Sequence, residues 1–193
     1  MKLNPPKVYF FLILFVVCFP TYTFATLQDK IFSKAKDTKS ITSLFIQKRQ
    51  ISVLPLPLIS KGKFNYHYEE GIVWEIQEPM QSKIIISKEG VQTEDNFAIA
   101  ETKGSSKLSE ILLSLFSGNL ETLETYFYVD VKGDTNQWHL LLEPKNNLVA
   151  AQIASISIKG KESVESLYIL ESNGDSSSLV FTSSRINLLE ENP

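Results

Sequence analysis

The segment from Ser60 to Pro79 constrains the fold of this chain more than any other part of the sequence. Large apolar side chains occupy alternate positions before and after a turn, around Phe64 and then around Trp74. Such alternation is typical of strands with one buried face, and the turn over Glu69–Gly71 predicts a hairpin. Because Pro79 cannot donate a ladder hydrogen bond, the second strand should end there. The apolar face of this hairpin must be buried against helices, a second sheet or an apolar ligand.

Most of the remaining segments also predict strands. The strand expected over residues 41–51 has Phe45 on one face and Leu44 and Ile46 on the other, which suggests cover on both faces for part of its length. The prolines within 54–58 indicate an extended apolar loop. Further strands are expected at 83–87, 91–94, 126–132, 137–143, 153–159, 164–171 and 178–181, and the tail from Asn187 should fray. Short connections make these roughly nine to eleven strands antiparallel.

Two segments have helical spacing instead. One is a short amphipathic helix over Leu27–Lys36, and the other starts near Ser106 and stops at Gly118. The second has apolar residues three and four apart: Leu108, Ile111, Leu112, Leu115 and Phe116. A further short helical turn is expected over 119–124. The fold class is therefore mainly β with helices (α+β), a large antiparallel sheet that closes into a barrel or curls into a half-barrel plugged by these helices. The inserted helix could be fixed core or a movable lid.

The N-terminus has the layout of a secretory signal peptide. A basic start at Lys2 and Lys7 precedes an unbroken apolar run over 8–19, and small residues at Thr23 and Ala25 predict cleavage after Ala25. An uncleaved anchor stays an alternative, and lipidation at Cys18 is disfavoured because bulky valines precede it. We therefore expect residues 1–25 to be a signal peptide and 26–193 to be one domain, located in the periplasm and free of disulfides.

Charge and motifs exclude several functional classes. Removing the two leader lysines from a formal charge of −3 gives −5, and no basic block exists, so neither nucleic acid nor an anionic membrane surface is an expected partner. The two histidines, His67 and His139, lie on the polar phase of their strands and should face outward. Adjacent Glu69 and Glu70 fit a solvated turn better than an acid–base pair. We expect no catalytic residues, no metal, no cofactor and no enzymatic activity.

Aromatic residues are in excess, and two interpretations of them stay open. They could form the core of a β protein, or a subset of them could line a cavity for an apolar ligand, because rings with a polar edge suit a cavity that is alternately wet and filled. The set contains Phe45, Phe64, Tyr66, Tyr68, Trp74, Phe97, Phe116, Tyr126, Phe127, Tyr128, Trp138, Tyr168 and Phe181.

The order of motifs resembles the periplasmic outer-membrane lipoprotein carrier family (LolA). The likeness runs through 45–49, 60–64, Ile72–Trp74 with Pro79 five residues after the tryptophan, 138–144, 156–158, 173–175 and 179–181. The resemblance implies an unclosed, strongly curved half-barrel covered by the N-terminal helix and the inserted lid helix. It also implies non-enzymatic transport of acylated cargo. By position, the cavity-wall candidates are Phe45, Phe64, Ile72, Trp74, Ile84 and Ile86, to which we add Tyr66 and Trp138; the lid candidates are the five apolar residues of the inserted helix.

One departure from the family affects the lid. In well-known members an arginine six residues before this tryptophan ties the lid down, whereas this chain has Tyr68 there, next to Glu69 and Glu70. How the lid closes, and whether the cargo is a triacylated lipoprotein or a glycolipid or polyene-type lipid, is left open. The implied partners are the cargo, an inner-membrane donor complex and an outer-membrane acceptor, with the carrier a monomer. The alternative is a non-transporting periplasmic adaptor that docks a membrane export complex.

Overall fold

The computed structural model describes residues 25–93 and 105–189, with side chains described from residue 109 in the second range. The expected leader up to residue 24, Phe97, and the side chain of Leu108 lie outside this description. The elements are α1 (Leu27–Lys36), β1 (Thr38–Gln50), β2 (Leu58–His67), β3 (Gly71–Glu78), β4 (Ser82–Ser87), β5 (Gly90–Thr93), α2 (Ser105–Phe116), α3 (Leu120–Tyr126), β6 (Phe127–Gly133), β7 (Trp138–Pro144), α4 (Asn147–Ala150), β8 (Ile153–Gly160), β9 (Val164–Glu171) and β10 (Ser176–Leu188).

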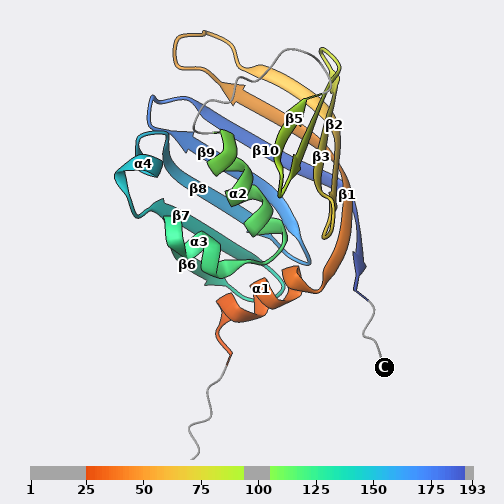
Figure 1. The fold of residues 1–193 in the computed structure, drawn as a ribbon. Coiled ribbons are helices and arrows are strands. Elements are labelled where there is room, and N and C mark those ends of the chain that lie inside the picture. The colour runs from red at the N-terminus through yellow and green to blue at the C-terminus, as the bar shows by residue number, and fades with distance from the viewer. Residues whose placement is uncertain (1–24, 94–104, 190–193) are drawn as a thin grey trace, which may run out of the picture.

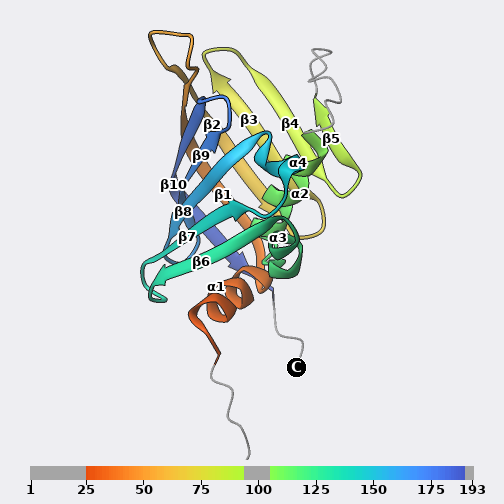
Figure 2. The same ribbon diagram turned by 90° about the vertical axis from the view of Figure 1, so that its left-hand side faces the viewer.

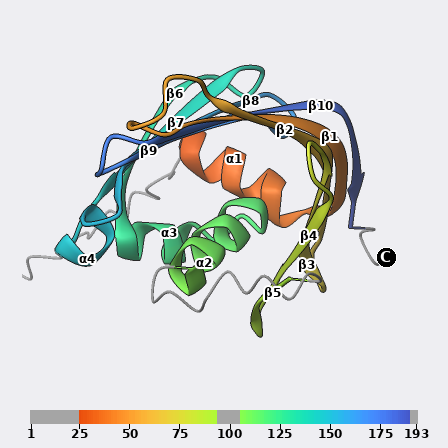
Figure 3. The same ribbon diagram turned by 90° about the horizontal axis from the view of Figure 1, so that it is seen from above.

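Ten strands form one antiparallel sheet in the order β5-β4-β3-β2-β1-β10-β9-β8-β7-β6. Neighbouring strands are joined by short connections, with the exception of β1 and β10. These are the first and last strands, and they pair with each other at the centre of the sheet. Among the described strands, β5 and β6 form the two edges, so the sheet stays open. It curls strongly, and α1, α2 and α3 lie in its hollow (Figures 1 and 3). The expected unclosed half-barrel with helices is therefore confirmed.

Capping explains where α1 begins. The Thr26 hydroxyl accepts a hydrogen bond from the Asp29 backbone N–H at 3.2 Å, and the Asp29 carboxylate accepts one from the Thr26 backbone N–H at 2.9 Å. This reciprocal pair is a capping box, which stabilises the first turn of a helix. It also lowers the pKa of Asp29, chiefly through the Thr26 hydroxyl. The helix buries Phe32 against the sheet.

Three expectations about strands were wrong. Leu44 and Ile46 are each 46 % exposed, so β1 is covered on its concave face only. Tyr68 continues the alternation of Phe64 and Tyr66 and should share their buried face, but it is exposed in the β2–β3 turn, and its hydroxyl donates to Glu69 Oε1 at 2.7 Å. The last strand is longer than the expected 178–181 and does not fray at Asn187, whose amide donates to Ser40 Oγ at 2.9 Å.

Candidate functional site

Aromatic rings from four adjacent strands form the wall of the hollow. The register places Phe45 on β1 opposite Phe181 on β10, and Phe64 on β2 opposite Trp74 on β3. Ring centroids lie 5.1 Å apart for Phe64 and Phe181 and 5.6 Å apart for Phe64 and Trp74. Phe45 reaches Trp74 at 5.0 Å across β2, where the residue opposite Phe45 is Gly62, which has no side chain. The sheet thus presents a continuous, concave aromatic surface.

Helix α2 fills this hollow with its apolar stripe. Ile111, Leu112, Leu115 and Phe116 are all buried, as their spacing of three and four residues requires for one helix face. The ring of Phe116 is the deepest contact, with its centroid 4.7 Å from Phe64, 5.9 Å from Tyr66 and 6.2 Å from Phe181. The side chain that closes the aromatic wall therefore comes from the helix and not from the sheet.

The two helices α2 and α1 meet at the C-terminal end of α2. Gly118 ends α2 with φ +67°, and the Asn119 N–H donates to the Ser114 carbonyl at 2.8 Å. A side chain at Gly118 would collide with the carbonyl oxygen of Phe32 on α1, so only glycine allows this approach. Farther up the helix, Glu110 accepts a hydrogen bond from the Tyr126 hydroxyl at 3.0 Å. The C-terminal end of α2 is thus packed closely against α1.

Tyr66 carries the one buried polar side-chain atom without a hydrogen-bond partner in the described part of the chain. The residue is 2 % exposed, and burial raises the pKa of its hydroxyl, which is therefore neutral at pH 7. Leaving such a group unpaired costs about 1–3 kcal/mol. An orphan of this kind often lies at a functional site or marks a missing partner.

A small cavity borders the C-terminal end of α2 in the described part of the chain. A cavity of about 60 Å³ lies between α1, the end of α2 and β7, lined by Ile31, Ile41, Leu115, Phe116, Trp138 and Leu140, among others. Ligand pockets usually measure about 300–1,000 Å³. This cavity is therefore too small for a long acyl chain.

The structure brings most of the expected wall residues together. Phe45, Phe64, Tyr66, Ile72, Trp74 and Ile86 are buried in one core cluster, with Ile84 half-buried at its margin. Trp138 belongs to the same core cluster but comes from β7, and its indole N–H donates to the Lys161 carbonyl at 2.7 Å. Phe181 completes the wall; it was in the aromatic set of the sequence but not among the wall candidates. Finding it needed the pairing of β1 with β10, which places Phe181 opposite Phe45, 136 positions earlier in the chain.

Polar chemistry is sparse around the hollow. Within residues 25–93 and 105–189, no three His, Cys, Asp or Glu residues gather as a metal site would require. The imidazole of His139 hydrogen-bonds to Ser157 Oγ at 2.7 Å on the polar phase of β7 and β8. No helix in the described part of the chain is long and apolar enough to cross a membrane.

Comparisons with known proteins agree with this architecture. A family profile described as "Outer membrane lipoprotein carrier protein LolA-like" matches residues 23–180. The structure is similar to a MucA/MucB complex of Pseudomonas aeruginosa (TM-score 0.51, 9 % identity, 85 % of this chain and 57 % of that one) and to MucB alone (0.52, 11 %, 86 % and 60 %). A LolA superfamily protein from Nitrosomonas europaea has a TM-score of 0.47 with 10 % identity over 86 % of this chain and 96 % of its own. The sequence matches no curated protein.

An open, curled antiparallel sheet with an apolar helix in its hollow defines a class that includes lipoprotein carriers and MucB-like proteins. The profile covers most of the sequence, and the chain belongs to the family of LolA-like outer membrane lipoprotein carrier proteins. The chain spans little more than half the length of the two MucB structures, so that likeness concerns the fold alone.

Proposed function

We propose that this protein is a periplasmic carrier that shields an acylated or lipid-like cargo in the hollow under α2 during transfer toward the outer membrane. The observation that carries the proposal is that Phe116 of α2, and no strand, closes the aromatic wall. Exposing an acyl chain to water costs about 0.8 kcal/mol per CH₂, so a cargo with several chains needs such cover. The carriage is non-enzymatic and needs no cofactor.

Binding and release follow from competition between α2 and the cargo for the same wall. Displacing Phe116 exposes Phe64 and Phe181, and an acyl chain then takes the place of its ring. Because the protein must open before it can bind cargo, the apparent affinity equals the intrinsic affinity multiplied by the fraction of molecules that are open. The closed helix therefore keeps binding reversible. The unpaired Tyr66 hydroxyl would gain a partner if the carbonyl of an ester or amide entered beside it.

The route of the carrier follows from its expected export. In this proposal the leader is cleaved after Ala25, and the mature monomer takes cargo from an inner-membrane donor and passes it to an outer-membrane acceptor. The cargo is a lipoprotein or a glycolipid or polyene-type lipid. Tyr68, at the position of the family's lid-tying arginine, has its hydroxyl bound to Glu69. In this proposal the apolar contacts of α2, together with the Glu110–Tyr126 hydrogen bond, hold the lid closed instead.

Native mass spectrometry of the protein purified without detergent tests this proposal. Wild type should carry a lipid-sized mass, and Leu112→Glu or Leu115→Glu should lose it while the sheet stays folded, because a charge on the buried face of α2 cannot cover an acyl chain. Leu44→Glu, on the exposed convex face, is the matched control and should retain the lipid. If Leu112→Glu retains as much lipid as wild type, α2 is not the lid.

A second candidate is a non-transporting adaptor that docks an export complex. The small size of the remaining cavity, about 60 Å³, favours it, because a hollow already filled by its own helix needs no ligand. MucB, whose fold this chain shares, forms a complex with MucA. Absence of bound lipid, together with no saturable binding of a fluorescent fatty acid, would favour the adaptor over the carrier.

A further inference from the structure

Solvent-exposed apolar side chains are concentrated at one end of the molecule. The loop between β1 and β2 exposes Val53 to 84 % and Leu56 to 74 %, and Leu54, Leu58 and Ile59 beside them are also exposed. No charged residue occurs from Gln50 through Ser60. Single exposed aliphatic residues are ordinary on a protein surface, but a contiguous group of them marks an interaction site. We call residues 53–59 the apolar tip.

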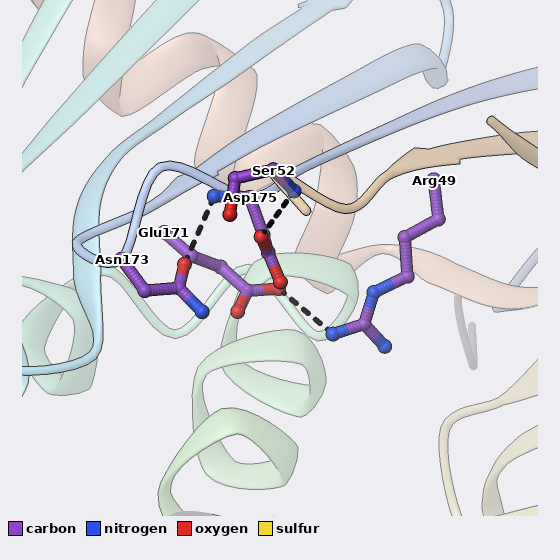
Figure 4. A network of polar contacts seen from close by, with 5 residues as sticks. All are labelled: Arg49, Ser52, Glu171, Asn173 and Asp175. Atoms are coloured by element: carbon purple, nitrogen blue, oxygen red, sulfur yellow. Dashed lines mark hydrogen bonds and ion pairs between the residues drawn. The ribbon is translucent and has the colours of Figure 1, made fainter. Parts of the chain in front are cut away.

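The base of the apolar tip is held by a polar network (Figure 4). Asp175 Oδ1 accepts a hydrogen bond from the Ser52 N–H at 2.8 Å, and the Asp175 N–H donates to Asn173 Oδ1 at 2.9 Å. The Ser52 N–H lowers the pKa of the Asp175 carboxyl, which is therefore charged at neutral pH. The Leu54 N–H donates to the Ile51 carbonyl at 2.9 Å. The tip is thus a braced loop whose aliphatic side chains are held away from the core.

A second apolar side chain projects at the same end. Met80, in the turn between β3 and β4, is 77 % exposed. The pairing of Lys61 with Glu78 places this turn at the end of the sheet where β2 begins. Figures 1 and 2 show the β1–β2 loop and the β3–β4 turn as separate projections at the end of the molecule opposite α1. Two separate apolar projections at one end can meet a flat surface together, whereas a peptide-binding site would need a groove between them.

Charges of both signs surround the base of the tip: two ion pairs, and Lys48, opposite Ile59, together with the Asp175 carboxylate. Arg49 meets Glu171 at 3.3 Å, and Lys61 meets Glu78 at 2.9 Å. An uncharged tip with balanced charges at its base matches a zwitterionic surface better than an anionic one. We propose that the apolar tip and Met80 form a membrane-contact surface that inserts into the interfacial region of a neutral phospholipid bilayer. This surface is separate from the hollow and does not require that the hollow carry lipid.

Flotation of the purified protein with vesicles of phosphatidylcholine and phosphatidylethanolamine tests the proposal. Wild type should float with the vesicles, and 0.5 M NaCl should change its binding by less than about twofold because insertion is not driven by charge. The double variant Val53→Asp/Leu56→Asp should bind about a hundredfold more weakly, roughly tenfold for each lost aliphatic contact. Both side chains lie in water, so the fold should be unaffected.

Leu188→Asp is the matched control. Leu188 is also exposed and pairs with Thr38 at the opposite end of β1, so its substitution should leave flotation unchanged. The proposal is overturned if wild type does not float, if the double variant floats like wild type, or if salt abolishes binding. Lack of flotation together with saturable binding to a purified envelope protein would assign the tip to a protein partner. The lid variant Leu112→Glu should still float, which separates this surface from the carrier function.

Discussion

The two halves of the concave face are lined by different side chains and closed in different ways. Strands β1, β2, β3 and β10 present rings, and α2 covers them with Phe116. Apart from Trp138, strands β7, β8 and β9 present aliphatic residues that are almost fully buried: Leu140, Leu142, Ile156, Ile158 and Leu167. Helix α3 lies beside this second half, next to β6 (Figure 2).

Polar contacts fix the helix of the aliphatic half. Gln28 of α1 donates to Glu124 of α3 at 2.9 Å, and the Lys145 N–H beyond β7 donates to the Tyr126 carbonyl at 2.8 Å. Helix α2 has the Glu110–Tyr126 hydrogen bond to α3, but its buried stripe meets the aromatic half through apolar contacts, which are non-directional and can be exchanged for those of a ligand. We infer that the aliphatic half is permanent core and that the aromatic half is the part that opens.

The largest expected effect compares one leucine from each half. Leu142→Ala should lower the free energy of unfolding by about 2–5 kcal/mol, because the site is fully buried among strands that cannot close the gap. Leu115→Ala, on α2, should cost less, because the helix can detach before the sheet unfolds. Urea denaturation of both lipid-free variants measures the difference. Equal losses would mean that α2 belongs to the permanent core.

The next effect concerns the ring that closes the wall. Phe116→Ala removes the contacts with Phe64, Tyr66 and Phe181, so the closed state loses stability and the open fraction rises. The apparent affinity for a fluorescent fatty acid should increase about tenfold, because less free energy is needed to open the protein before it binds. Leu142→Ala should leave this affinity unchanged. A weaker affinity for Phe116→Ala would show that Phe116 helps to hold the ligand instead of competing with it.

A smaller effect should come from the unpaired hydroxyl under α2. Tyr66→Phe removes a buried polar atom that has no partner in the closed state, so the free energy of unfolding should rise by about 1 kcal/mol. Tyr168→Phe, at an exposed position, should change nothing. Thermal denaturation of the lipid-free proteins measures both. Destabilisation by Tyr66→Phe would indicate that the hydroxyl already has a partner.

The smallest effect tests the exposed hydrogen bond that joins α2 to the end of α3. Glu110→Ala should lower the opening free energy of α2 by about 0.5 kcal/mol, the usual size for an exposed hydrogen bond, and should speed amide exchange in α2 about twofold. Exchange in β7 and β8 should be unaffected. Glu121→Ala, an acidic deletion on α3, is the control. Faster exchange across both halves would contradict independent opening.

The sequence predicted elements well where a single period continues. The alternation around Phe64 and Trp74 and the helical spacing from Ile111 to Phe116 gave the correct element types, and α1 has the expected bounds. The second half of β10 was missed because its side chains face water on both sides and carry no apolar alternation. The prediction that Leu44 and Ile46 are buried was wrong because periodicity does not show whether a second layer packs against that face of the sheet. The strand pattern alone allowed either a closed barrel or a half-barrel, and the resemblance to a family decided for the unclosed half-barrel.

The site was less predictable than the fold. The wall residues on β2 and β3 follow from one hairpin, but Phe181 joins them only through pairing of the two ends of the chain. Trp138 is aromatic like the wall residues, yet it lies on β7 in the other half. There its indole N–H donates a hydrogen bond to the Lys161 carbonyl. Which residues lie side by side in a curled sheet depends on the order of the strands. Local sequence patterns do not give that order.

The two tryptophans allow the most direct test, because Trp74 lies in the aromatic wall and Trp138 lies on β7, with β2, β1, β10, β9 and β8 between their strands. Two single-tryptophan proteins, Trp138→Phe and Trp74→Phe, are titrated with a fatty acid whose chain is brominated and quenches fluorescence on contact. The account predicts strong, saturable quenching of Trp74 and much weaker quenching of Trp138. No saturable quenching of Trp74, or quenching of Trp138 that equals or exceeds it, would contradict the claim that the hollow under α2 binds lipid.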